Sequence, residues 1–312
     1  MNRYFLIVAI VLIAFAGKGI TACTEPIDLR NDGMAPMLVI NAILTDTIIG
    51  FGYEYVSENK VVISKTTPFF SPEYTEAVIG AKVWINSDSL TMAYSGTYGL
   101  ERGFWGVPGK SYTLTVHYDI NGDGIDEIYT ATTTMPQKYQ LDSLSLIPIS
   151  WGSDFNALLS LHFQDSVGTD YFGAKLSNKN DQVHSKIYSD RVLRYCLFRH
   201  ELFSSEDKHR ILQPEDFTWI IRHKMRHNNN DEYLVFAGDT LSVQLEALSP
   251  EYHRFLDVAK TELSHNNPFF SGPRANLPTN IKGGAIGIFG AYTSSSATLA
   301  IPIYTPGLPK RP

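Results

Sequence analysis

The feature that most limits the possible folds of this chain is a series of short runs rich in β-branched and aromatic residues. Clusters of glycine, proline and serine separate these runs. In the clearest run, residues 111–118, apolar and polar side chains alternate without exception. One face of this run carries Tyr112, Leu114, Val116 and Tyr118. A period of two residues is typical of a β-strand that buries one face and exposes the other.

Similar runs recur along the chain, and few segments show a helical period. They lie at residues 37–44, 60–65, 81–86, 127–134, 144–149, 158–163, 171–176, 192–198 and 241–247. Many short strands with turn residues between them predict a mainly β fold. We expect an N-terminal antiparallel immunoglobulin-like β-sandwich, followed by a second β-rich domain that contains one amphipathic helix.

A proline marks the predicted boundary between the two domains. Pro136 ends a strand and is followed by the polar pair Gln137-Lys138. The sandwich domain is therefore predicted at residues 37–136 and the second β-rich domain at residues 137–305. The remaining residues, 306–312, are predicted to form a tail.

The second domain contains the predicted helix and ends in a glycine-rich segment. Ser249 can cap the helix, Pro250 suits its first position, and Glu251 suits the positive end of its dipole. An apolar stripe follows at helical spacing: Tyr252, Phe255, Leu256, Ala259 and Leu263. Further on, residues 283–292 and 297–302 are predicted to form a closing hairpin.

The N-terminal residues have the pattern of a bacterial lipoprotein signal. A positive start at residues 1–3 precedes an apolar run at residues 4–16, which is too short to span a bilayer comfortably. Ile20-Thr21-Ala22-Cys23 then supplies an aliphatic residue, two small residues and a cysteine. Residues 1–22 are predicted to be the signal peptide, Cys23 the lipid attachment site and residues 23–36 a tether.

An alternative interpretation of this segment stays open. Lys18 lies between the apolar run and Cys23, where a charge is unusual in a lipoprotein signal. The alternative is a plain signal peptide or an N-terminal membrane helix, with Cys23 incidental. If Cys23 is lipidated, its acyl chains exceed the two hydrophobic signals that stable membrane anchoring needs.

The net charge argues against nucleic-acid binding, and the cysteine content argues against disulfides and cysteine-based metal sites. The formal net charge is −6, so the chain as a whole has no electrostatic basis for binding nucleic acid. Cys23 and Cys196 are the two cysteines, and lipidation of the first would leave the second without a disulfide partner. Neither a disulfide framework nor a cysteine-based metal site is expected.

Residues 119–127, between two predicted strands, have the pattern of a calcium loop. The candidate ligands are Asp119, Asn121, Asp123, Asp126 and Glu127. Alternating oxygen ligands followed by Gly124, which allows a sharp turn, suit a hard cation with six to eight oxygen ligands. The loop lacks the glutamate that commonly completes such a shell at the twelfth position. The residue pattern predicts that this loop binds a structural Ca²⁺. The alternative is a hairpin turn built from Asn-Gly and Asp-Gly.

Common catalytic motifs are absent from the sequence. The chain has neither a Gly-x-Ser-x-Gly elbow nor a His-Glu-x-x-His zinc motif. Two alternatives to a binding role stay open: a surface glycan-binding module and a hydrolase without a recognisable motif. Exposure of Phe69 and Trp105 on one surface would favour the first. A pocket with paired carboxylates, or a histidine beside a nucleophile, would favour the second.

Packing and turn motifs along nearly the whole chain resemble one known family. They are Cys23–Leu29, Leu38–Thr45, Val78–Val83, Pro108–Val116, Tyr129–Ala131, Met135-Pro136, Leu248–Tyr252, Phe255-Leu256, Asn267–Phe269, Asn280-Ile281 and Phe289–Tyr292. The chain resembles the bacterial lipoproteins, common in Bacteroidota, called domain of unknown function 4249. The resemblance implies an outer-membrane lipoprotein, on either the periplasmic face or the cell surface, and points to a place beside a TonB-dependent receptor. It supplies no catalytic residues, so we expect a non-enzymatic binding or accessory component.

Overall fold

Five strands of the first half of the chain follow the predicted runs at residues 37–44, 60–65, 81–86, 111–118 and 127–134, and four further strands lie outside these runs. The structure is a computed structural model, and it describes residues 35–46, 49–51, 54–56, 59–67, 75–99, 106–151, 154–164, 168–178, 191–202, 219–222, 224–227, 230–233, 237–264 and 276–304. The first nine strands are β1 (Leu38–Thr45), β2 (Ile49–Phe51), β3 (Glu54–Val56), β4 (Lys60–Lys65), β5 (Lys82–Ile85), β6 (Asp88–Tyr94), β7 (Thr97–Gly99), β8 (Ser111–Tyr118) and β9 (Glu127–Thr134).

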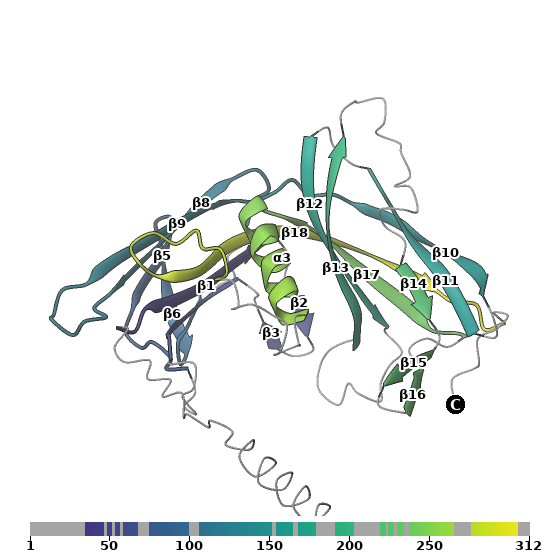
Figure 1. Cartoon of the computed structure of the whole chain (residues 1–312). Coiled ribbons are helices and arrows are strands. Elements are labelled where there is room, and N and C mark those ends of the chain that lie inside the picture. Colours follow the sequence, from purple (N-terminus) through teal and green to yellow (C-terminus); the bar gives the residue numbers. More distant parts are fainter. Residues whose placement is uncertain are drawn as a thin grey trace, which may run out of the picture. The chain divides into compact units, whose positions relative to one another are not determined.

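The second half adds longer strands and a helix (Figure 1). Its strands are β10 (Leu141–Trp151), β11 (Asp154–Phe163), β12 (Gly168–Asn178), β13 (Arg191–Leu202), β14 (Trp219–Arg222), β15 (Lys224–His227), β16 (Asn230–Tyr233), β17 (Thr240–Leu248) and β18 (Ile286–Ala300). The helix is α3 (Pro250–Ser264). No helix among the described residues is long and apolar enough to cross a membrane.

Eleven strands form one mixed sheet in the order β13-β12-β17-β18-β1-β4-β7-β6-β5-β8-β9. Smaller sheets contain β10-β11-β14, β15-β16 and β2-β3. The predicted mainly β class is therefore confirmed. The immunoglobulin-like arrangement and the domain boundary after Pro136 stay predictions, and residues 36–312 group as one unit in the structure.

Strand β18 joins the two halves of the large sheet. Its first part pairs in parallel with β1, from Val39 opposite Ile286 to Thr45 opposite Tyr292. Its second part pairs antiparallel with β17, from Leu248 opposite Tyr292 to Thr240 opposite Ala300. One strand thus changes its partner, and the direction of pairing, at Tyr292.

This continuous strand corrects the predicted closing hairpin. The polar residues 293–296 were expected to form its turn, but they stay in the ladder opposite residues 244–247 of β17. Two of their hydroxyl groups form hydrogen bonds to the segment that connects β9 and β10. The Thr293 hydroxyl donates to the Gln137 carbonyl oxygen at 3.0 Å, and the Ser295 hydroxyl accepts the Leu141 N–H at 2.9 Å. These two bonds fasten the connection between β9 and β10 across β18.

Asp46 strengthens this crossing from the other side. Its carboxylate accepts the Ser294 N–H at 2.9 Å and the Lys138 ammonium at 2.8 Å. The Asp46 side chain is only 6% exposed, so solvent screens this ion pair less than a typical surface pair. Asp46 therefore links three segments: the end of β1, the middle of β18 and the connection after Pro136.

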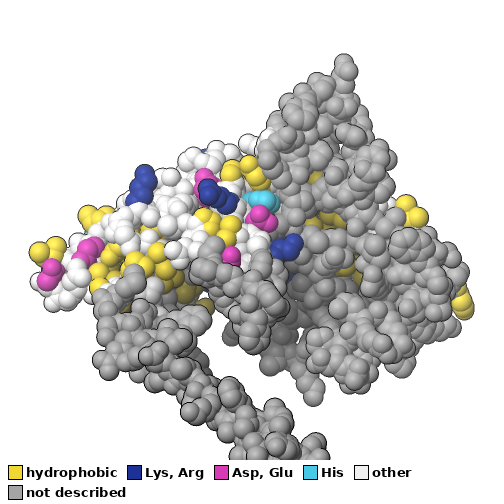
Figure 2. Space-filling view, in the orientation of Figure 1, with side chains coloured by type: hydrophobic (Ala, Val, Ile, Leu, Met, Phe, Trp, Pro, Cys, Tyr) yellow, Lys and Arg dark blue, Asp and Glu magenta, His cyan; other side chains and the backbone are white. Residues whose placement is uncertain are grey.

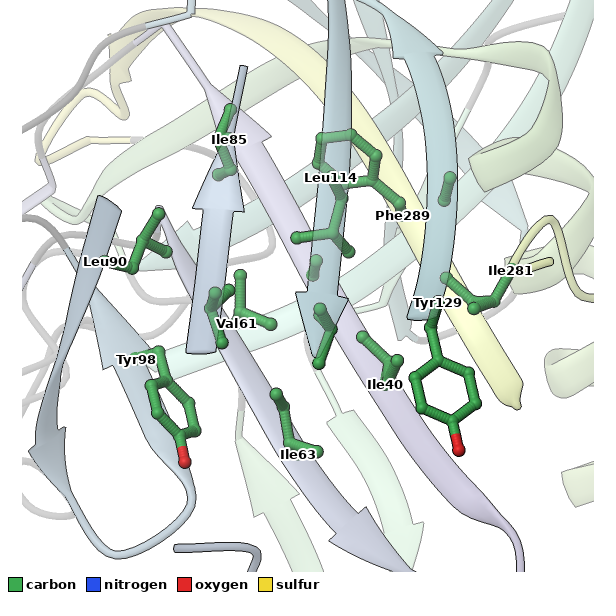
Figure 3. Packing of buried hydrophobic residues seen from close by; sticks show 14 of the residues in the cluster. Ile40, Val61, Ile63, Ile85, Leu90, Tyr98, Leu114, Tyr129, Ile281 and Phe289 are labelled. Atoms are coloured by element: carbon green, nitrogen blue, oxygen red, sulfur yellow. The ribbon is translucent and has the colours of Figure 1, made fainter. Parts of the chain in front are cut away.

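Two hydrophobic cores flank the crossing, and β18 contributes to both. Phe289 and Ala291 belong to the core of the first half, whereas Ala297 and Leu299 pack against the core of the second half. All four have odd numbers, so they lie on the same face of the strand. Figure 3 shows Phe289 beside Leu114 in the first core, together with Ile40, Val61, Ile63, Ile85, Leu90, Tyr98, Tyr129 and Ile281.

The second core lies between the large sheet and the layer formed by β10 and β11. Leu144 and Leu161 of this layer belong to the same buried cluster as Leu176 and Leu245 of the large sheet. An aromatic group completes it: Tyr139, Phe163 and Phe172 meet in edge-to-face contacts, with ring centroids 5.1–6.4 Å apart. Such contacts add to the free energy gained from burial alone.

Helix α3 begins where predicted and packs on β18 through a glycine. A side chain at Gly290 would lie only 2.6 Å from the Tyr252 ring, so glycine allows this helix to approach the strand. Tyr252 also stacks with Tyr292, with ring centroids 6.3 Å apart. Ser249 takes the capping position, but its hydroxyl accepts the Ala291 N–H at 3.4 Å. The residue therefore ties the start of the helix to the sheet.

The parallel pairing of β18 with β1 depends on a second glycine, Gly287. Its φ is +119°, and a Cβ atom there would lie 2.1 Å from the carbonyl oxygen of Ile40. We expect Gly287→Ala to lower the free energy of unfolding by about 2 kcal/mol or more, because it combines backbone strain with a clash against backbone. Denaturant unfolding of the purified protein measures this change.

Gly99→Ala is the matched control for this substitution. A Cβ at Gly99 meets no heavy atom within 4 Å, and this glycine lies in a strand of the same sheet. Its unfolding midpoint should stay close to that of the wild type. Equal stability of the two variants would contradict the close approach of β18 to β1.

Candidate functional site

The predicted calcium loop is the tip of the hairpin formed by β8 and β9. Both strands have the bounds that the alternating pattern predicts, and Tyr118 opposite Glu127 is their last pair before the loop. At the left end of the view in Figure 2, acidic side chains lie beside hydrophobic ones. Gly122 and Gly124 have φ values of +74° and +87°, a backbone conformation that favours glycine at both positions.

Asp119 organises the backbone of this tip. Its carboxylate accepts the N–H groups of Gly122 at 2.6 Å, Gly124 at 2.7 Å and Asp123 at 3.2 Å. These bonds, first the one from Gly124, hold the pKa of the Asp119 carboxyl below its ordinary value, because they favour the ionised form. Acidification would therefore weaken this turn, since the bonds are lost as the carboxylate takes up a proton.

Three of the other candidate ligands share the tip with Asp119. Glu127 accepts the Ile120 N–H at 3.0 Å and also the side-chain amide of Asn121. Asp123 accepts the Ile125 N–H at 2.8 Å. The sequence thus identified residues that the fold does gather in one loop, all of them in hydrogen bonds within it.

The fifth candidate ligand, Asp126, is directed to another strand. Its carboxylate accepts the Lys82 ammonium of β5 at 2.6 Å. Among the residues that the structure describes, no three histidine, cysteine, aspartate or glutamate side chains form a group that could hold a metal ion. Binding of Ca²⁺ at residues 119–127 stays a prediction, and it would require Asp126 or Glu127 to turn toward the ion.

An aromatic pair lies on the outer face of the same strands. Trp84 of β5 and His117 of β8 meet edge to face, with ring centroids 5.0 Å apart. Both are partly exposed, because Val83, Ile85 and Val116 fill the core on the opposite face. Hydroxyl-bearing side chains accompany the pair on this outer face: Ser111, Thr113, Thr115, Thr130, Thr132 and Thr134.

Sequence reasoning missed Trp84, although its alternation with Val83 and Ile85 could have indicated an outward position. It selected Phe69 and Trp105 as candidate surface aromatics instead, and these lie outside the described residues. The lipidation candidate Cys23 and the whole predicted signal also lie outside them.

A serine and a histidine are paired on the small sheet. The Ser145 hydroxyl of β10 lies 2.7 Å from the His162 Nε2 of β11, within hydrogen-bond distance. Both residues are partly buried. This is a histidine beside a nucleophile, the arrangement that the sequence alone could not show because it depends on the cross-strand register.

One family model matches nearly the whole chain. The family described as Domain of unknown function (DUF4249) aligns with residues 24–298. No curated protein matches the chain. The matched segment contains every strand of the large sheet except the last two residues of β18.

The calcium prediction can be tested by thermal unfolding. We expect the melting temperature to be higher in millimolar Ca²⁺ than in chelator, because an ion would neutralise the acidic side chains of residues 119–127 and bind only the folded loop. Asp123→Ala should abolish the difference, whereas Asp257→Ala, on the exposed face of α3, should retain it. Equal melting of the wild type in calcium and chelator would exclude a calcium site here.

Proposed function

Because the chain belongs to the DUF4249 family, whose match begins one residue after Cys23, we propose that the mature protein starts at this cysteine and is anchored by its lipid. In this proposal the protein is a binding or accessory component at the outer membrane. The observation that carries the proposal is the coincidence of two boundaries. The pattern Ile20-Thr21-Ala22-Cys23 predicts signal cleavage before Cys23, and the matched family segment begins at residue 24.

The distance between anchor and fold supports a role close to the membrane. Residues 24–37 separate Cys23 from the first residue of β1. Even a fully extended segment of this length reaches only about 50 Å. A partner embedded in the same membrane is therefore within reach, and a TonB-dependent receptor is the partner that we propose.

Metabolic labelling with palmitate tests the anchor. We expect the wild type to incorporate label and Cys23→Ser to lose it, because the signal peptidase pathway modifies the thiol of this residue. Cys196→Ser is the matched control and should be labelled like the wild type, since Cys196 lies in β13. An unlabelled wild-type protein would end the proposal of a lipid anchor.

Co-purification from membranes tests the accessory role independently of the anchor. A tagged wild-type chain, extracted in mild detergent and cross-linked beforehand, should retain an outer-membrane receptor. Cys23→Ser, released from the membrane, should retain much less because it loses the high local concentration that anchoring provides. A labelled protein that retains no membrane partner would contradict the accessory role while leaving the anchor intact.

A second candidate function, glycan binding, is favoured by Trp84 and its surroundings. Aromatic rings suit stacking on the apolar faces of sugars, and neighbouring hydroxyl groups suit their polar edges. Trp84 and His117 lie among the serine and threonine residues of the outer face of β5, β8 and β9. This composition of the outer face supports the glycan-binding alternative.

Affinity electrophoresis against a panel of polysaccharides tests this candidate. We expect Trp84→Ala to weaken binding at least about fivefold, because stacking contributes about 1 kcal/mol beyond the area that it buries. Tyr94→Ala is the matched control, since Tyr94 is an exposed aromatic residue, 62% accessible, on β6. Equal binding by the two variants, or no retention of the wild type by any polysaccharide, would exclude this face as a glycan site.

A further inference from the structure

We propose that Ser145 and His162 form the nucleophile and general base of a site that cleaves carboxylic esters. This activity goes beyond the proposed anchored binding role and does not depend on it. A serine hydroxyl is a weak nucleophile unless a neighbouring base takes its proton, and the base must lie within about 2.6–3.2 Å. The 2.7 Å separation between the Ser145 Oγ and the His162 Nε2 meets this requirement.

Strand register places the pair on the outer face of the small sheet. Ser160 lies opposite Ser145, and Ser143 lies opposite His162. Leu144 and Leu161 alternate with the pair and are buried in the second core, at 8% and 1% exposure. Ser145 and His162 are only partly buried, so a substrate can approach from the side away from the core.

A bulge precedes the pair in β10. Between Leu141 and Ser143 the ladder shifts by one residue, and no residue of β11 lies opposite Asp142. Both Asp142 and Ser143 are exposed, so the bulge interrupts the strict alternation of faces. The regular part of the ladder, from Ser143 onward, holds Ser145 and His162.

The surroundings of Ser145 indicate the class of substrate. Ile147, two residues further along β10, is 53% exposed and offers an apolar contact. This side chain fits an ester with an apolar acyl group.

The proposed reaction needs no reactant other than the ester and water. The Ser145 Oγ attacks the carbonyl carbon while His162 takes the hydroxyl proton. The tetrahedral intermediate then expels the alcohol, which receives that proton from His162, and leaves an acyl group on Ser145. A water molecule, deprotonated by His162, attacks the acyl carbon. This second step releases the carboxylic acid and restores both side chains.

A fluorophosphonate probe, which reacts with activated serines, tests the nucleophile directly. We expect the full chain to be labelled at Ser145, as located by peptide mass spectrometry, and to hydrolyse p-nitrophenyl butyrate. Ser145→Ala should lose both, whereas Ser160→Ala, which alters the serine on the neighbouring strand, should retain both. No labelling of the wild type, or equal labelling of Ser145→Ala, would overturn the proposal.

Two further variants separate catalysis from structure. His162→Gln should lower the labelling rate at least about a hundredfold, because it removes the general base. Asp142→Asn is the matched control and should leave the rate unchanged, because the structure joins this exposed carboxylate to neither Ser145 nor His162. Thermal unfolding of each variant shows whether the fold is retained. A folded His162→Gln variant with an unchanged labelling rate would also overturn the proposal. The palmitate-labelling and co-purification experiments test the anchored binding role separately, and their outcomes do not depend on esterase activity.

Discussion

The dual pairing of β18 is the constraint on which the rest of the structure depends. Its first part lies against β1 and its second part against β17. The large sheet is continuous only because this strand serves both halves. The same face of β18 then supplies Phe289 to one core and Leu299 to the other. A shift of register by one residue would turn these side chains away from both cores together.

The candidate sites depend on β18 through the segments that lie beside it. Just before the strand, Lys282 exchanges two backbone hydrogen bonds with Thr130 of β9, at 2.7 and 3.2 Å. Asn280 adds bonds to the Thr132 carbonyl oxygen and to the backbone of Phe289. These contacts hold the hairpin that bears the acidic loop. On the other side, the bond from the Leu141 N–H to Ser295 fixes the start of β10, four residues before Ser145.

Local patterns in the sequence predicted the parts of the fold that local patterns control. The alternation in residues 111–118 and the helix that starts at Pro250 both have the predicted positions. The segment 283–302 was predicted wrongly as a hairpin, because Thr293 and the three serines after it have the composition of a turn. The hydroxyls of Thr293 and Ser295 instead form bonds to Gln137 and Leu141, which lie more than 150 residues away in the chain.

The candidate sites also differ in whether local sequence or long-range contacts determine them. The acidic loop is contiguous in sequence, so its residues could be named in advance, although the bond between Asp126 and Lys82 could not. Trp84 faces outward as its alternation indicates. The contact of Ser145 with His162 depends on the register of β10 against β11, which places Ser143 opposite His162 and Ser145 opposite Ser160, and this register cannot be derived from composition or periodicity.

Hydrogen exchange in increasing denaturant tests the central role of β18 most directly. Backbone amides of β4 and β8 report on the first core, and those of β12 and β17 report on the second. If both cores depend on one shared strand, the most protected amides of the two groups should open with the same free energy and the same denaturant dependence. Protection that is lost in β4 and β8 while β12 and β17 remain fully protected would contradict this account.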